Sequence, residues 1–306
     1  MERKFAILIV AIVALAVVAV AAIAALSLSL ARGGSVGLSY VALVKIEGSI
    51  AFRREYGIVM PATSVEEYVE VLERARKDPL VKAVVLYVNS PGGEAAASER
   101  LYFAVEELAR EKVVVAYVEG YGTSGAYMAI LPAAKILASN SSLVGSIGVY
   151  SIVVSCRDLL GKLGIHVYTF KSGRLKDVGS PFRELTEEDR EVLEGIVQGL
   201  FEVFKARVLK HREVDPEVFS GRPYLAEEGI EKGLVDGIGT LEDALREARS
   251  LAGLPEDAPV RELKPRKPGL FDLLFGGALG GLRAFVLPSY ELLAMWPPPA
   301  AMALPP

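Results

Sequence analysis

Two runs of apolar and β-branched residues constrain the fold of this chain most, one from Val81 to Val88 and one that begins at Val113 and reaches the glycines at Gly120. Neither run alternates apolar with polar positions, and this pattern is typical of a strand in a parallel sheet, buried on both faces. Between them, apolar residues recur at helical spacing, at Leu101, Ala104, Val105 and Leu108. Parallel strands joined by a helix predict an α/β protein.

The same alternation extends to both sides of these runs. A strand is predicted from Tyr40 to Gly48, and the spacing of Ser64 and Glu67 predicts a capping box at the start of a helix. Further strands are predicted in the segments AKILAS, SIGVYSIVVS and IHVYTF, with a short helix near 157–163 between the last two. The segment 51–62 has no clear period and is predicted to be a loop.

Two helices are predicted in the C-terminal half. Thr186 and Asp189 have the spacing of a cap for a long helix, and the segment LEDALREARSL forms the last one. The long helix is expected to turn one apolar face inward, made of Val192, Ile196, Leu200 and Phe204. The fold class is therefore α/β, with layered β-α repeats.

The N-terminal segment is predicted to cross a membrane. From Phe5 to Leu30 there is no charged residue, and about 20 apolar residues suffice to span a bilayer. A cleaved secretory signal is the alternative, since Ala22-Ile23-Ala24 has the small residues of a cleavage site. Arg3 and Lys4 favour a cytoplasmic N-terminus, so a single-pass protein of the cell membrane would hold its catalytic part on the extracytoplasmic side. Residues 1–37 are thus predicted to be an anchor and linker.

The C-terminal segment differs in composition from the rest. After Pro268 only Asp272, Arg283 and Glu291 are charged, and prolines and glycines interrupt any long helix. Residues 254–306 are predicted to be a Pro-rich apolar tail that follows a domain at 38–253. The tail either lies on the membrane surface or is an apolar extension without a binding role.

Composition excludes several classes of protein. Cys156 is the one cysteine of the chain, so no intrachain disulfide can form. A net charge of −4 and the absence of a basic aromatic stripe argue against a nucleic-acid partner. No cluster of His, Cys, Asp and Glu has metal-ligand spacing, and neither a metal nor another cofactor is predicted.

Ser124 lies where the second buried run gives way to a helical segment, in the sequence GYGTSGAYMA. Such a junction presents a side chain on a sharp turn, which suits a nucleophile but also occurs in ordinary tight connections. The sequence SPGG, which ends at Gly93, likewise joins a strand to a helix. The backbone N–H groups of Gly93 and Gly125 are therefore candidate donors to an oxyanion, although SPGG alone is equally consistent with a plain turn.

The residues alone leave several candidates for the general base. His166 is predicted to lie in a strand, and His211 lies among charges beyond a helix end. A lysine can replace histidine when its amine is uncharged. The loop FKSGRLKDVGSPF offers Lys171 and Lys176, and physical reasoning from the sequence does not choose between them.

Five segments of the sequence together resemble the signal peptide peptidase A family of membrane-anchored Ser-Lys peptidases. The resemblance runs from Val41 to Ala248 and rests on NSPGG, GYGTSGAYMA, VGSIGVY, KSGRLKDVGSPFRELTEED and GRPYLAEEGIEKGLVDGIG. It implies a Clp protease/crotonase-like fold, Ser124 as nucleophile, Lys176 as general base and Gly93 in the oxyanion hole. The chain departs from the family's usual sequence at Thr123 and Ala126 beside the nucleophile and at Val144, changes that roughly preserve residue size.

The resemblance also implies an assembly and an activity. Ser146 would orient the lysine amine, unless it is a structural serine of a turn. A homo-oligomeric ring is expected, in which the serine of one subunit meets the lysine of its neighbour. The expected function is a membrane-anchored serine endopeptidase that cleaves remnant signal peptides or other apolar peptides. A crotonase-like acyl-CoA enzyme and a non-catalytic membrane scaffold of the same fold are the alternatives.

Overall fold

The computed structural model describes residues 39–52, 62–265 and 292–295, with residues 62, 63 and 292–295 described by their backbone only. The predicted anchor at 1–37, most of the loop at 51–62 and most of the tail lie outside these residues. None of the helices in the described ranges is both long enough and apolar enough to cross a bilayer.

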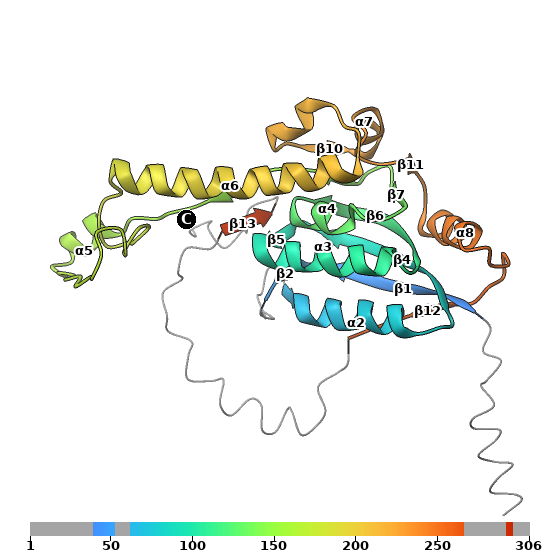
Figure 1. The fold of residues 1–306 in the computed structure, drawn as a ribbon. Helices are drawn as coiled ribbons and strands as arrows, with labels where there is room; N and C mark the ends of the chain where they lie inside the picture. The colour runs from blue at the N-terminus through green and yellow to red at the C-terminus, as the bar shows by residue number, and fades with distance from the viewer. Residues whose placement is uncertain (1–38, 53–61, 266–291, 296–306) are drawn as a thin grey trace, which may run out of the picture. The chain divides into compact units, whose positions relative to one another are not determined.

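The main sheet is mostly parallel and holds the two runs of buried residues side by side (Figure 1). Its strand order is β10-β8-β6-β4-β1-β12, and β7 joins the sheet beside β6 and pairs in turn with β11. Only β10 with β8 is antiparallel among the pairs described in this sheet. The strands are β1 (Tyr40–Glu47), β4 (Val81–Ser90), β6 (Val113–Thr123), β7 (Lys135–Ala138), β8 (Leu143–Gly145), β10 (Pro223–Leu225), β11 (Gly237–Ile238) and β12 (Val260–Glu262).

Helices cover both faces of this sheet, which explains why its strands have no polar face. On β4, Val84 and Leu86 pack into the core cluster on one face, whereas Ala83 and Val85 face the other cluster with Leu245. The first face is covered by α2 (Val65–Lys77), α3 (Ala95–Ala109) and α4 (Gly125–Ile130), and the second by α8 (Leu241–Leu251). The predicted α/β fold class is therefore confirmed. β12 lies within the segment 254–306 and pairs with β1.

β6 does not end at its glycines, as the sequence suggested, but continues to Thr123. Its first half pairs with β7 through Val115–Val118, and its second half pairs with β8 through Tyr121–Thr123. Gly120 thus lies where the strand exchanges one neighbour for another. This exchange delivers the end of β6 directly to the start of α4.

A second, smaller sheet has the order β3-β2-β5-β13-β9. β2 pairs in parallel with β3 and β5, whereas β13 is antiparallel to both β5 and β9. The strands are β2 (Ser49–Ala51), β3 (Ala62–Ser64), β5 (Gly92–Glu94), β9 (Tyr150–Ser151) and β13 (Leu292–Met295). β13 belongs to the segment predicted to be a Pro-rich apolar tail, for which no strand was predicted.

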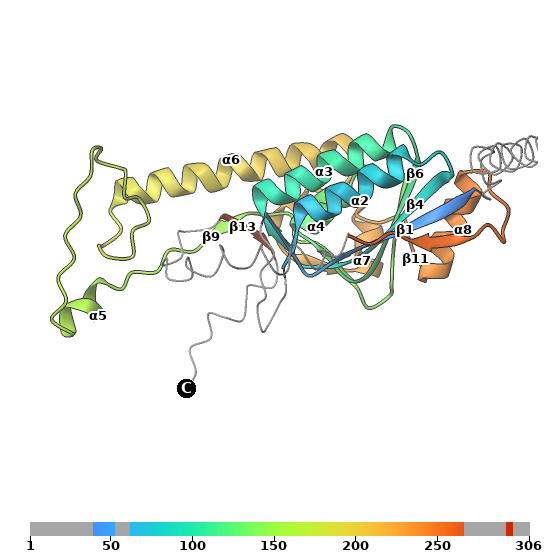
Figure 2. The same cartoon turned by 90° about the horizontal axis from the view of Figure 1, so that it is seen from below.

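Residues 152–186, called the arm below, connect β9 to α6 (Glu187–His211) and contain the short helix α5 (Arg157–Lys162). Figures 1 and 2 both show the arm running out along the N-terminal half of α6, away from the main sheet. The predicted strand SIGVYSIVVS is reduced to β9, and IHVYTF forms no strand. Every side chain from 165 to 170 is exposed, because no strand within the described chain pairs with this segment.

The predicted helix caps differ in outcome. Thr186 and Asp189 form the capping box of α6. At α2, however, the Ser64 hydroxyl donates to the Phe52 carbonyl at 3.0 Å instead of capping the helix. The predicted apolar face of α6 is wrong in its N-terminal part: Ile196 is exposed, because only the C-terminal half of the helix packs on the core. The remaining helices are η1 (Pro216–Ser220) and α7 (Ala226–Glu231).

Candidate active site

Ser124 adopts a backbone conformation that few residues other than glycine accept. It links β6 to α4 with φ of 54° and ψ of −124°, and its relative exposure is 2%. A non-glycine residue in this region is strained by about 1–3 kcal/mol and persists only where its surroundings enforce the conformation. Here the Ser124 N–H donates to the Gly145 carbonyl at 2.7 Å. A turn enforced in this way holds the Ser124 side chain in a single orientation.

The short helix after Ser124 is anchored firmly in the core. All six residues of α4 are buried, which requires the small side chains of Gly125, Ala126 and Ala129. The Tyr127 hydroxyl donates to the Leu234 carbonyl at 2.8 Å, and burial raises the pKa of this phenol. Because α4 cannot shift, the turn at Ser124 is held from both sides.

Gly93 lies in β5, which contacts α4. A Cβ atom at this position would lie 1.9 Å from the carbonyl oxygen of Ile50, so the close approach of β2 admits only glycine. Ser90 pairs with Gly122 of β6, and its hydroxyl accepts a hydrogen bond from the Gly92 N–H at 3.2 Å. The SPGG segment therefore lies beside the end of β6, as the two strand-to-helix junctions predict.

Ser146 also has a positive φ, of 52°, and follows the Gly145 that bonds to Ser124. Its hydroxyl donates to the Gly221 carbonyl at 3.1 Å, and its N–H donates to the Arg222 carbonyl at 3.1 Å. Both contacts fix the turn after β8. They are compatible with a structural role, and the hydroxyl oxygen keeps the capacity to accept a second hydrogen bond.

Lys176 lies on the arm, and its side chain is exposed. Among the described residues, no hydrogen bond joins its amine to Ser124. Figures 1 and 2 show the arm and α4 at different ends of α6. A single copy of the chain therefore brings together Ser124, Gly125, Gly93 and Ser146 but not Lys176.

Arg183 fixes the turn that carries Lys176, and sequence reasoning did not identify it. Its guanidinium donates to both carboxylate oxygens of Asp177, at 3.0 and 3.1 Å, and to both oxygens of Asp189 in the first turn of α6. Hydrogen bonds from Arg183 and Lys171 lower the pKa of Asp177 to about 2. The spacing of these three residues in KDVGSPFRELTEED was the available signal, since a bidentate arginine can join two carboxylates.

The two lysines left open by the sequence differ in their contacts. The Lys171 ammonium donates to Asp177 at 2.6 Å and to the Arg174 carbonyl at 2.8 Å, which makes it part of the structural network. The Lys176 backbone N–H donates to the Gly173 carbonyl, and no ion pair involving its side chain occurs within the described ranges. The ammonium group of Lys171 is thus engaged by Asp177 and the Arg174 carbonyl, whereas no such contact engages the Lys176 amine among the described residues.

The histidines do not form a triad with Ser124 in the described residues. His166 is exposed on the arm and is not in a strand, contrary to the sequence prediction. His211 Nε2 lies 2.9 Å from the Tyr102 hydroxyl, and burial lowers the pKa of the imidazole. No group of three or more potential metal ligands is found in the part of the chain that the structure describes.

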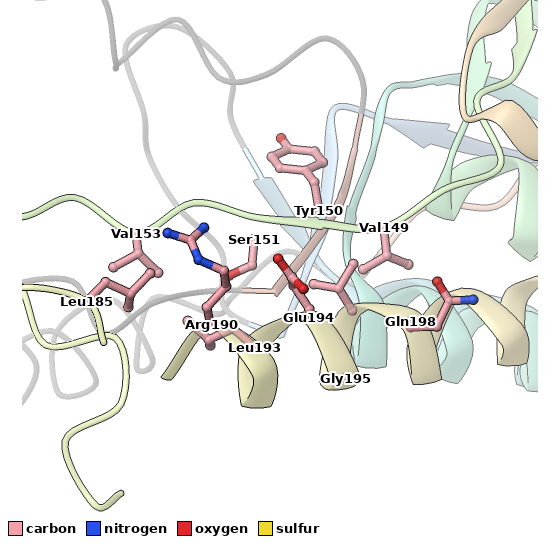
Figure 3. Close-up of a pocket in the computed structure, with 11 residues that line it drawn as sticks. Val149, Tyr150, Ser151, Val153, Leu185, Arg190, Leu193, Glu194, Gly195 and Gln198 are labelled. Atoms are coloured by element: carbon pink, nitrogen blue, oxygen red, sulfur yellow. The ribbon is translucent and has the colours of Figure 1, made fainter. Parts of the chain in front are cut away.

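A cavity of about 850 Å³ lies between β9 and the N-terminal half of α6 (Figure 3). Figure 3 shows Val149, Val153 and Leu193 at its walls, with Arg190 and Glu194 contributed by α6. The lining is mixed: Val149, Val153 and Leu193 contribute apolar surface, whereas Arg190 and Glu194 contribute charge. This volume is within the range that small-molecule and side-chain binding sites occupy.

Comparisons with known proteins agree with the motifs. The model of Peptidase family S49 matches residues 106–255, a range that includes Ser124 and Lys176. A candidate protease of Methanocaldococcus jannaschii is 43% identical over 212 residues, which cover 68% of each chain. Protease 4 of Salmonella typhi is 33% identical over 235 residues, covering 75% of this chain and 37% of that protein. The chain therefore spans about two thirds of one relative and little more than a third of the other.

Among solved structures, a mutant of ClpP1 from Listeria monocytogenes matches with a TM-score of 0.42 and 14% identity, over 66% of this chain and 94% of that one. This similarity is too low to establish a common fold. The sequence matches, in contrast, favour the predicted peptidase over an acyl-CoA enzyme or a scaffold. By its similarity to the M. jannaschii protein and its match to the family model, the chain belongs to peptidase family S49 and is a serine peptidase.

Proposed function

We propose that the protein is an endopeptidase in which Ser124 is the nucleophile and Lys176 of a second copy is the general base. The observation that carries the proposal is the enforced positive φ of Ser124 at a buried strand-to-helix junction. Strain of this kind is concentrated at catalytic residues, because it holds a nucleophile in a reactive direction. Gly93 and Gly125 supply the backbone N–H groups for the oxyanion.

The proposal invokes a second copy because the arm and α4 lie at different ends of α6 within one chain (Figures 1 and 2). The arm also exposes more apolar surface than a free segment tolerates, including Leu163, Tyr168 and Phe170, the last of which is 96% exposed. Exposed apolar patches of this kind mark protein–protein contacts. We propose that the arm packs on a neighbouring subunit in a homo-oligomeric ring with a Clp protease/crotonase-like fold.

In the proposed reaction, the neutral Lys176 amine removes the proton of the Ser124 hydroxyl as Oγ attacks the peptide carbonyl. The oxyanion accepts hydrogen bonds from the N–H groups of Gly93 and Gly125. The protonated amine then gives its proton to the leaving nitrogen, and water hydrolyses the acyl-enzyme by the same route. The Ser146 hydroxyl, which donates to Gly221, offers its oxygen to the amine and orients it.

Apolar peptides are the proposed substrates, among them remnant signal peptides. The apolar part of the cavity beside β9, formed by Val149, Val153 and Leu193, supports this preference. The uncharged run at 5–30 supports a single-pass anchor in the cell membrane with the catalytic domain, residues 38–253, on the extracytoplasmic side. The tail at 254–306 would follow this domain, attached to it through β12.

Complementation between inactive variants tests the proposal. Ser124→Ala and Lys176→Ala proteins are each expected to lose cleavage of a quenched apolar peptide, and their mixture is expected to recover part of it. Lys162→Ala, which removes another exposed lysine of the arm, is the matched control and keeps full activity. Fluorophosphonate labelling is expected to be lost in Ser124→Ala. A mixture that stays inactive after demonstrated subunit exchange refutes the shared site.

A further inference from the structure

The turn that carries Ser146 is held by a second turn, at Gly221 and Arg222. The Ser146 hydroxyl donates to the Gly221 carbonyl and its N–H donates to the Arg222 carbonyl, both at 3.1 Å. A Cβ atom at Gly148 would lie only 3.3 Å from the Gly221 Cα, so the two turns are in direct contact. Because Ser146 is only 5% exposed, the second turn determines where its hydroxyl points.

The hydrogen bond from Ser146 to Gly221 fixes how this serine can bond to an amine. A hydroxyl has one proton to donate and two lone pairs that accept. The Gly221 carbonyl already receives the O–H, so the Ser146 oxygen can only accept further hydrogen bonds. An amine that donates an N–H to this oxygen keeps its nitrogen lone pair free. A serine that donated to the amine would instead occupy the lone pair that must receive the Ser124 proton.

The Arg222 guanidinium anchors the second turn to three neighbouring elements. It donates to both carboxylate oxygens of Glu228 in α7 and to Glu217 in η1, and its Cζ lies 3.9 Å from the centre of the Tyr224 ring in β10. The Tyr224 hydroxyl in turn donates to the Glu217 carbonyl at 3.0 Å. A bidentate arginine within such a network fixes geometry, although an isolated exposed ion pair contributes little. Gly221 has a φ of 85° and no side chain to hold it, so the orientation of its carbonyl depends on Arg222.

We infer that Arg222 is a positioning residue for the general base. Through the peptide group that it shares with Gly221, Arg222 keeps the Ser146 proton directed away from the site and the Ser146 oxygen open to the Lys176 amine of the second copy. The inference rests on the proposed function, because it takes Lys176 to be the base. Arg222 acts through Ser146, and this separates its role from a general contribution to the stability of the domain.

A double-variant cycle in the full chain tests the inference. Arg222→Met keeps much of the apolar stem and removes every hydrogen bond of the head group, and Ser146→Ala removes the hydroxyl. Each variant is expected to lower kcat about tenfold with KM little changed, because misplacement of the base affects the chemical step. The double variant is expected to lose about tenfold as well, since both changes act on the same hydrogen bond. A loss of about a hundredfold in the double variant overturns the inference, because it means that the two residues act independently.

Arg100→Met is the matched control and is expected to keep full activity. Arg100 donates two hydrogen bonds to the Glu66 carboxylate, and its exposure is similar to that of Arg222. A pH profile separates positioning from a loss of folded protein, which lowers activity equally at every pH. Loss of a hydrogen bond to the ammonium form lowers the pKa of a lysine, so the acid limb of kcat is expected to move to lower pH by about 0.5–1 pH unit in Arg222→Met and in Ser146→Ala. A lowered kcat without this movement in Arg222→Met overturns the inference.

Hydrogen exchange of the Ser146 N–H gives a readout that does not depend on activity. Its protection is expected to fall about tenfold or more in Arg222→Met and to stay unchanged in Arg100→Met, because its acceptor is the Arg222 carbonyl. Equal protection in Arg222→Met and the unmodified protein overturns the inference. If protection falls as expected while Ser124→Ala still reacts with a fluorophosphonate, the contact between the two turns stands and the proposed chemistry at Ser124 fails.

Discussion

Replacement of Arg183 by methionine is expected to release the arm without unfolding the sheet. The guanidinium joins Asp177, the neighbour of Lys176, to Asp189 at the start of α6. Methionine keeps most of the apolar stem and removes every hydrogen bond of the head group. The two carboxylates would then face each other with only Lys171 and Thr186 as partners.

The magnitude follows from the burial of the Arg183–Asp189 pair. The Asp189 side chain is 1% exposed and the Arg183 side chain is 28% exposed. Loss of one partner of a fully buried pair costs about 3–5 kcal/mol, and the partial exposure of Arg183 reduces this to about 2–3 kcal/mol. Because the arm does not pack into the core, the loss appears as local opening. A cost of 2–3 kcal/mol corresponds to about 30- to 150-fold more open arm.

Native-state hydrogen exchange measures this opening. The N–H groups of Lys176, Val178 and Ser180 are bonded to carbonyls within the arm and should lose protection by that factor, while β4 and β6 keep theirs. Arg157→Met is the matched control, because the exposed pair of Arg157 with Glu184 contributes at most about 1 kcal/mol. If Arg183→Met changes protection no more than this control, the arm is held by something other than the arginine.

Four further outcomes are expected. Gly93→Ala should lower the free energy of urea unfolding by about 3 kcal/mol, because the new Cβ would lie 1.9 Å from the Ile50 carbonyl oxygen. The variant should also lose fluorophosphonate labelling, and retained labelling would contradict the prediction. Gly199→Ala, which has open space in α6, should instead raise that free energy by about 1 kcal/mol, and a decrease would show that this face of α6 is occupied. The pKa of Asp177 is lowered to about 2, so its stabilising effect on the arm is complete above about pH 4 and is lost as the pH falls toward 2. The amide NMR signals of Lys176 and Val178 should shift over this range and should not change between about pH 4 and 5. Leu193→Glu places a charge in the cavity beside β9 and should lower kcat/KM for an apolar peptide about tenfold without changing fluorophosphonate labelling, whereas equal losses in both would point to general damage.

The sequence was sufficient for the sheet and its helices because their signals are local and repeated. Val81–Val88 could only be a strand buried on both faces, and the core clusters on the two sides of β4 bear this out. The capping box of Thr186 and Asp189 was equally direct, because its contacts lie within one turn. The position of Ser124 between a strand and a helix was predictable for a related reason, because the buried run, the glycines and the helical segment are adjacent in the sequence.

Features that depend on distant parts of the chain could not be read in this way. The segment at 165–170 has the apolar and β-branched character of a strand, yet a strand also needs a partner, and this chain provides none among its described residues. The residues alone left Lys171 and Lys176 open and only the family resemblance favoured Lys176, because the ion pair of Lys171 with Asp177 depends on the folded turn. The pairing of β13 with β5 joins residues about two hundred positions apart, and no local sequence pattern in the tail predicts it.

The separation of the arm from Ser124 has a consequence for when the enzyme becomes active. If hydrolysis needs a lysine from another copy, a newly synthesised chain is inactive until it assembles with other copies. The rate per molecule would then rise with the concentration of the protein rather than stay constant. The expression level alone would then determine whether the protein reaches the concentration at which it assembles. Dilution during cell growth would lower the activity without any inhibitor.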